Sequence, residues 1–141
     1  MEKLKIIALF SGGASALQYL LSKDPNWGKS YEIVCAIANK NNTKGEKFCR
    51  ENGIKFLSLN TKNFCIKNGY NEPLNAMPEN LRQYYYAELL RYIKPYEPDL
   101  ILLSGFMLRI TEPTYWNIDF DFVSLVKFTR TGFRSSLGSG K

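Results

Sequence analysis

The sequence predicts an α/β fold in which helices flank a parallel sheet that is incomplete toward the C-terminus. Two nearly continuous apolar runs, residues 4–10 and 31–38, have the character of strands that are buried on both faces. A third run, residues 99–106, is the most hydrophobic stretch of the chain. Segments with helical spacing separate the runs. Because strands that alternate with helices are typical of βαβ units, we expect the three runs to be parallel neighbours.

A turn of small residues joins the first predicted strand to the first predicted helix. Leu17, Leu20 and Leu21 repeat at helical spacing after this turn. Small hydroxyl side chains cap the free amides at helix starts, so we expect Ser11 or Ser15 to cap this helix.

The middle of the chain continues the alternation of helices and strands. Residues 43–51 predict a helix that begins with a capping box of Thr43 and Glu46. Apolar and polar side chains alternate over residues 54–59, which predicts a third strand. Residues 60–79 show no period and contain several Asn, Gly and Pro residues, so we interpret them as a long loop.

A helix with one apolar face is predicted between this loop and the most hydrophobic run. Its face consists of Leu81, Tyr85, Leu89, Tyr92, Ile93 and Tyr96, and two prolines end it. The three consecutive tyrosines at 84–86 invite comparison with a platform that stacks bases. At this spacing, a core face with one or two exposed rims is the better interpretation. The strand that follows should be central, with its carboxyl end facing a ligand site.

The pattern deteriorates toward the C-terminus. We expect residues 1–117 to form one domain and residues 118–141 to be a divergent segment. Within that segment, residues 119–128 are compatible with one more strand, and the Ser-, Gly- and Arg-rich residues 129–141 predict a loose tail. The central strand would then keep an open apolar edge, which association into a homo-oligomer would cover.

Composition excludes several classes of function. With 45% hydrophobic residues and no apolar run near the ~20 residues of a membrane span, the chain is not expected to cross a membrane. The first residues enter a strand without the pattern of a signal peptide, which predicts a cytoplasmic location. The net charge of +6 comes from dispersed basic residues, so it does not favour a nucleic-acid partner.

The residues that usually carry metal and proton chemistry are scarce. Cys35, Cys49 and Cys65 are too far apart in sequence for a metal-binding pair, and they suggest no disulfide framework, so we expect reduced core thiols and no metal. The chain contains no histidine, which excludes any chemistry that uses an imidazole.

The first strand-turn-helix unit has the form of an anion site. Gly12 and Gly13 carry no side chains that would shield the backbone N–H groups from a ligand. The positive end of the helix dipole adds to the attraction for a phosphate group. A plain glycine turn is an equally good interpretation of residues 10–18 taken alone.

Several motifs, in this order, resemble glycinamide ribonucleotide (phosphoribosylglycinamide) formyltransferases of purine synthesis. The family loop Ser-Gly-x-Gly-Ser-x-Leu-Gln matches residues 11–18, with Ala14 in place of the second glycine and Ala16 in place of an asparagine. The Ser-Asn-Lys that ends the family's second strand matches residues 38–40, which read Ala-Asn-Lys.

Two later segments strengthen the resemblance. The helix segment 82–89 and the segment 96–107, which ends in Gly-Phe-Met, look like those of the family. The resemblance covers about residues 3–113 and implies the Rossmann-like fold of these formyltransferases.

The resemblance implies two groups of binding residues. The phosphate of the substrate, glycinamide ribonucleotide, would contact Gly12, Gly13, Ala14, Ser15, Ala16 and Arg82. The co-substrate formyltetrahydrofolate would lie in a pocket formed by Leu103, Phe106, Met107, Leu108 and Ile110. Without the family, the arginine is equally well interpreted as a solvated side chain, and the second group as the end of a strand and its turn.

The chain departs from the family where catalysis occurs. The family has an Asn-x-His-Pro segment and a later Asp, of which the Asn and His polarise the formyl group and stabilise the oxyanion. An ungapped continuation from the Gly-Phe-Met turn puts Ser124 at the Asn, Val126 at the His and Lys127 at the Pro, and the Asp would lie past Lys141. The resemblance therefore implies a folate-dependent formyltransferase without catalytic residues in this chain, and hence an inactive one.

Two other classes of protein stay open. An ATP pyrophosphatase has a Ser-Gly-Gly-x-Asp-Ser loop, of which Ser11, Gly12 and Gly13 match the first three places. Ser15 stands where that loop needs its magnesium-binding Asp, and Ala16 stands at its Ser. The third class is a non-catalytic phosphate-binding module.

Overall fold

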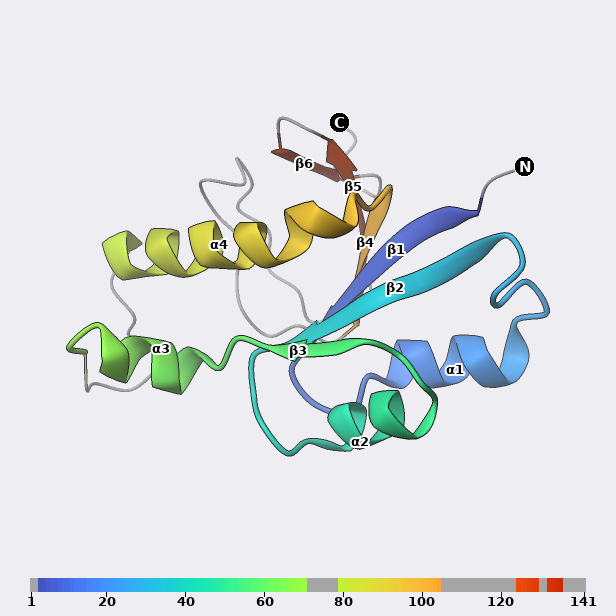
Figure 1. Ribbon diagram of the computed structural model, residues 1–141, viewed down its shortest axis with the longest axis horizontal. Coiled ribbons are helices and arrows are strands. Elements are labelled where there is room, and N and C mark those ends of the chain that lie inside the picture. The colour runs from blue at the N-terminus through green and yellow to red at the C-terminus, as the bar shows by residue number, and fades with distance from the viewer. Residues whose placement is uncertain (1–2, 71–78, 105–123, 130–131, 136–141) are drawn as a thin grey trace.

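One mixed sheet forms the centre of the protein. The computed structural model describes residues 3–70, 79–104, 124–129 and 132–135 of the 141-residue chain. Within these residues, six strands lie in the order β3-β2-β1-β4-β5-β6 (Figure 1). The strands are β1 (Leu4–Phe10), β2 (Tyr31–Ala38), β3 (Phe56–Ser58), β4 (Leu100–Ser104), β5 (Ser124–Thr129) and β6 (Gly132–Ser135). The helices are α1 (Ser15–Lys23), α2 (Lys44–Glu51), α3 (Thr61–Lys67), α4 (Glu79–Ile93) and the short 3-10 helix η2 (Lys94–Tyr96).

The first four strands confirm the predicted α/β fold. β1 pairs in parallel with β2 on one side and with β4 on the other, and β2 pairs in parallel with β3. β1 and β2 have the predicted bounds because both are nearly continuous apolar runs. β3 is shorter than expected, and β4 begins one residue later than the predicted run, whose last residues, 105 and 106, lie outside the described part of the chain.

Helices cover both faces of the parallel strands, with α4 on one face and α1 and α2 on the other (Figure 1). Successive side chains of a strand point to opposite faces, so each strand contributes to two cores. The core under α4 contains Ile7, Leu9, Cys35, Ile37, Leu59, Tyr85, Tyr86, Leu89, Ile93, Ile101 and Leu103. The core under α1 and α2 contains Ile6, Ala8, Phe10, Ala14, Leu17, Ala36, Ala38, Cys49 and Leu102.

The tyrosine-rich helix α4 follows the prediction. Leu81, Tyr85 and Leu89 are buried on its inner face. Tyr86 is also buried, whereas Tyr84 is 65% exposed, so one of the three consecutive tyrosines forms an exposed rim. They form a core face rather than a stacking platform.

The phenol of Tyr85 makes a buried hydrogen bond that we expect to stabilise the fold. Its hydroxyl donates to the carbonyl oxygen of Leu59 at 2.7 Å. Tyr85→Phe would leave that buried acceptor without a donor and should lower the free energy of unfolding by about 1–2 kcal/mol in urea denaturation. Tyr84→Phe removes an exposed hydroxyl and should change it by less than about 0.5 kcal/mol. Equal effects of the two substitutions on the free energy of unfolding would show that the hydroxyl of Tyr85 does not stabilise the fold.

The interpretation of residues 60–79 as a loop is wrong for its first part, where α3 spans Thr61–Lys67. Asn60 caps this helix, since its side chain accepts a hydrogen bond from the amide of Asn63. Its apolar residues are three consecutive ones, 64–66, which give no visible helical period. The cap by Asn60 and the packing against α4 therefore stabilise this helix. Residues 71–78 of the predicted loop lie outside the described part of the chain.

The C-terminal segment also differs from the prediction. β5 pairs with β4 in antiparallel orientation and β6 pairs with β5, so the edge of β4 is not open and the loose tail expected from residue 129 contains a strand. Backbone pairing explains the difference. The free N–H and C=O groups of a strand edge can pair with a segment even when the side chains of that segment bury little surface. The strand considered over residues 119–128 is found at Ser124–Thr129. The boundary near residue 117 lies outside the described residues.

The three cysteines are free and buried, as expected. Burial raises the pKa of all three thiols, and that of Cys49 reaches about 11, because a buried site disfavours the thiolate. In the described part of the chain, no helix is long and apolar enough to span a membrane.

Candidate phosphate-binding loop

A four-residue loop, residues 11–14, leads from the carboxyl end of β1 into α1. Ser11 and Ala14 are each 2% exposed, whereas Gly12 and Gly13 between them are exposed. A Cβ atom built on either glycine would have no heavy atom within 4 Å. The loop therefore presents its two glycines to open space at the carboxyl edge of the sheet.

The start of α1 is capped differently from the prediction. Its N-cap is Ala14, whose side chain makes no capping hydrogen bond, so neither Ser11 nor Ser15 occupies the N-cap position. Instead, the hydroxyl oxygen of Ser104 at the end of β4 accepts a hydrogen bond from the amide of Ala16 at 3.1 Å. A residue 88 positions away in sequence thus satisfies one of the amides that a helix start leaves unpaired.

Ala14 adopts a left-handed backbone conformation with φ 55° and ψ 46°. This conformation costs a residue with a Cβ atom about 1–2 kcal/mol but is free for glycine. Glycine at this position would avoid that cost.

Helix α2 supports the loop from the side. The amide of Gly45 donates to the carbonyl oxygen of Gly12 at 3.0 Å, and the side-chain amide of Gln18 donates to the carbonyl oxygen of Gly13. These two hydrogen bonds engage the carbonyl oxygens of both glycines and help to fix the shape of the loop.

The capping box predicted for α2 is present with one change. The hydroxyl oxygen of Thr43 accepts from the amide of Glu46 at 3.2 Å, and the carboxylate of Glu46 accepts from the amide of Asn42 rather than from that of the cap residue. A hydrogen bond from Arg50, helped by the Asn42 amide, lowers the pKa of the Glu46 carboxyl. These contacts fix the helix that holds the loop.

The other predicted phosphate ligands lie in different surroundings. Ser15 is exposed beside the glycines, whereas Ala14 is buried and the amide of Ala16 is engaged by Ser104. Arg82 is partly exposed in the first turns of α4, on the opposite face of the sheet from α1. Since α4 connects two parallel strands, it runs antiparallel to them and begins at their carboxyl edge.

The predicted folate pocket is largely outside the described residues. Phe106, Met107, Leu108 and Ile110 all fall there. Leu103 is fully buried in the core under α4, so its side chain packs inside the domain rather than lining an open pocket.

A buried asparagine, Asn39, was assigned no function from the sequence. It directly follows β2, is 3% exposed, and its side-chain oxygen has no hydrogen-bond donor in the described structure. Its backbone amide donates to Phe10 at the end of β1, and its carbonyl oxygen accepts from the amide of Thr61. A polar residue directly after a buried strand is the signal that marks it in the sequence.

An open groove of about 580 Å³ lies apart from the loop, between α3 and α4. Asn60, Asn63 and Tyr92 contribute to its lining, and none of the residues predicted to bind a ligand does.

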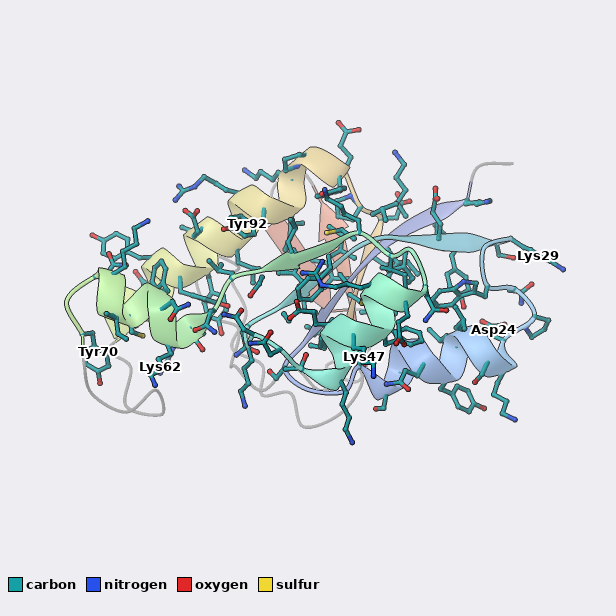
Figure 2. All side chains as sticks on the ribbon, turned by 60° about the horizontal axis from the view of Figure 1, so that its bottom comes forward. Asp24, Lys29, Lys47, Lys62, Tyr70 and Tyr92 are labelled. Carbon is teal, nitrogen blue, oxygen red and sulfur yellow. The ribbon has the colours of Figure 1, made fainter. Side chains whose placement is uncertain are left out.

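Figure 2 shows Lys47 on α2 and Lys62 on α3 pointing outward from separate parts of the surface. Among the described residues, no group of three or more His, Cys, Asp or Glu side chains is placed to hold a metal ion.

These features define an α/β domain with an accessible glycine loop at the start of a helix. A family model described as formyl transferase matches residues 4–117, and the chain therefore belongs to the formyl transferase family. A curated relative, the trifunctional purine biosynthetic protein adenosine-3 of Drosophila melanogaster, is 31% identical over 114 residues, which are 79% of this chain and 7% of that protein.

Solved structures agree with this assignment. Phosphoribosylglycinamide formyltransferase from Campylobacter jejuni is 28% identical with a TM-score of 0.59, and the match covers 79% of this chain and 52% of that one. The Coxiella burnetii enzyme is 26% identical with a TM-score of 0.57, covering 79% and 46%. The Brucella melitensis enzyme, 22% identical with a TM-score of 0.59, covers 83% and 55% and shows the common fold. The chain thus spans about half the length of these structures.

Proposed function

We propose that the loop of residues 12–16 binds the phosphate group of glycinamide ribonucleotide, as part of a phosphoribosylglycinamide formyltransferase fold. The observation that carries the proposal is the open space above Gly12 and Gly13 at the N-terminus of α1. Backbone amides at a helix N-terminus and the helix dipole favour an anion there, and the amide of Ala16 is already bonded to Ser104. Arg82 lies in the first turns of α4, which begins at the same edge of the sheet. Its side chain would approach a phosphate from the α4 side.

The formyl donor in this proposal is formyltetrahydrofolate, the co-substrate of the family. Its pocket would form after β4, from Phe106, Met107, Leu108 and Ile110, with Leu103 contributing only backbone groups because its side chain is buried. The chain itself would bind without catalysing, since the ungapped continuation puts Ser124 and Val126 where the family uses its Asn and His. It is a proposal for a binding domain of a formyltransferase, not for a working enzyme.

A charge placed on the loop should test the phosphate site. Gly13→Asp puts a carboxylate where the phosphate would lie, and Gly13→Ala adds only a methyl group in space that is empty to 4 Å. Glycinamide ribonucleotide should raise the melting temperature of the wild-type chain, since a ligand that binds the native state alone stabilises it by RT ln(1 + [L]/Kd). We expect a smaller rise for Gly13→Ala and none for Gly13→Asp.

The same thermal-shift series separates the other classes of protein. An undiminished shift in Gly13→Asp would mean that the anion binds elsewhere. Release of pyrophosphate from ATP that depends on magnesium would instead indicate the ATP pyrophosphatase class. A shift with the ribonucleotide, together with no reaction of ATP, supports the proposed site.

A further inference from the structure

We propose that the side chain of Asn39 accepts a hydrogen bond from a hydroxyl or N–H group of the phosphorylated ligand. Asn39 would thereby favour phosphate monoesters that carry such donors over inorganic phosphate. This inference rests on the phosphate site proposed above and extends it to the part of the ligand beyond the phosphate.

The first argument is that the side-chain oxygen of Asn39 has no hydrogen-bond donor among the described residues. Asn39 is 3% exposed, and its Oδ1 atom has no donor in the described structure. Most buried polar groups in proteins are paired, because a buried acceptor without a donor loses the hydrogen bond that water would give it. The hydroxyl of Thr61 is already directed at the backbone carbonyl of Asn39, at 3.4 Å. A bound molecule that reaches this oxygen would supply the missing donor.

The second argument is position. Cys35 and Ile37 of β2 face the core under α4, and alternation places the side chain of Asn39 on that same face. The amide of Asn39 donates to the carbonyl of Phe10 at 3.3 Å, directly before the glycine loop. Arg82 lies on the helix that covers this face. A ligand that extends from the loop toward α4 would pass over Asn39.

The chemistry of the ligand decides what Asn39 contacts. A phosphate dianion offers acceptors only, so it cannot satisfy Oδ1, whereas a sugar hydroxyl, an amine or an amide N–H can. The loop amides and the side chain of Asn39 then contact different parts of one ligand: donors face the phosphate, and an acceptor faces the group attached to it.

Asn39→Leu tests this division because leucine has a similar shape and no acceptor. Titration calorimetry with ribose 5-phosphate and with inorganic phosphate should show that wild-type protein prefers the sugar phosphate. Asn39→Leu should weaken ribose 5-phosphate binding about five- to tenfold, the range of one hydrogen bond, and leave inorganic phosphate unchanged. The melting temperature of the ligand-free variant should rise by a few degrees, since an unpaired buried acceptor is removed.

Asn41→Leu is the matched control, because Asn41 follows the same strand but is exposed and pairs with the hydroxyl of Ser58. It should alter neither affinity. Equal ribose 5-phosphate affinity in wild-type and Asn39→Leu protein would overturn the inference while the phosphate site stands. A lower melting temperature or failure to fold in Asn39→Leu would also overturn it, because the amide would then be structural. Absence of binding of both ligands to wild-type protein would instead refute the proposed phosphate site.

Discussion

The chain should transfer no formyl group from formyltetrahydrofolate to glycinamide ribonucleotide above the uncatalysed background. Removal of one donor that stabilises an oxyanion typically costs about 100- to 1000-fold in rate. In the proposed ungapped continuation from the Gly-Phe-Met turn, Ser124 and Val126 take the places of the family's Asn and His. We therefore expect a rate at least about 1000-fold below that of an intact phosphoribosylglycinamide formyltransferase measured in the same assay.

The strand register gives a second reason for this expectation. Ser124 pairs with Leu103 near the carboxyl end of β4, and Val126 pairs with Ile101 further down the strand. Of the two positions, Val126 therefore lies two residues further from the carboxyl edge, where the glycine loop lies. We expect a histidine at position 126 to be too far down the strand to act on a substrate held by that loop.

Restoring the residue types alone should not restore activity. Ser124→Asn combined with Val126→His supplies the two side chains in the present register, and we expect it to remain inactive, with an intact formyltransferase as the positive control. Formyl transfer by the unaltered chain within tenfold of that control would refute the inactive assignment. Activity gained by the double variant alone would show that the register places these residues correctly.

The strands could be predicted from sequence because burial on both faces leaves a continuous apolar run. β1 and β2 are of this kind. Helix α3 could not, because its short apolar run has no period and its start depends on a local cap by Asn60. β6 and the antiparallel pairing of β5 with β4 could not be predicted for another reason, since backbone pairing is a property that side-chain patterns barely express.

The geometry of the candidate loop could be predicted in part for similar reasons. Gly12 and Gly13 are recognisable because an exposed loop before a helix needs small residues. The contact between Ser104 and the amide of Ala16 joins two distant segments, so neither segment alone reveals it. The position of Asn39 directly after a strand is only a weak signal, because an asparagine there is ordinarily a turn residue, and its burial in the structure is what distinguishes it.

Gly45→Ala should be among the most destabilising single substitutions in this chain. A Cβ atom at Gly45 would lie 2.4 Å from the ring of Phe10 and 2.6 Å from the carbonyl oxygen of Gly12. Phe10 is fully buried and the second contact is to backbone, so neither neighbour can rotate away. Overpacking of this kind costs about 1–3 kcal/mol, and we expect the upper end of that range in urea denaturation.

Two further results decide whether Gly45→Ala destabilises the protein through the contact of Gly45 with the loop. Alanine favours helices over glycine by about 1 kcal/mol, so a neutral or stabilising Gly45→Ala would mean that α2 shifts freely and does not support the loop. Gly12→Ala is the matched control, because its Cβ atom meets nothing within 4 Å and the stability should change by less than about 0.5 kcal/mol. Because the amide of Gly45 holds the carbonyl of Gly12, Gly45→Ala should also weaken the thermal shift caused by glycinamide ribonucleotide. A full shift in a destabilised variant would show that the loop keeps its shape without α2.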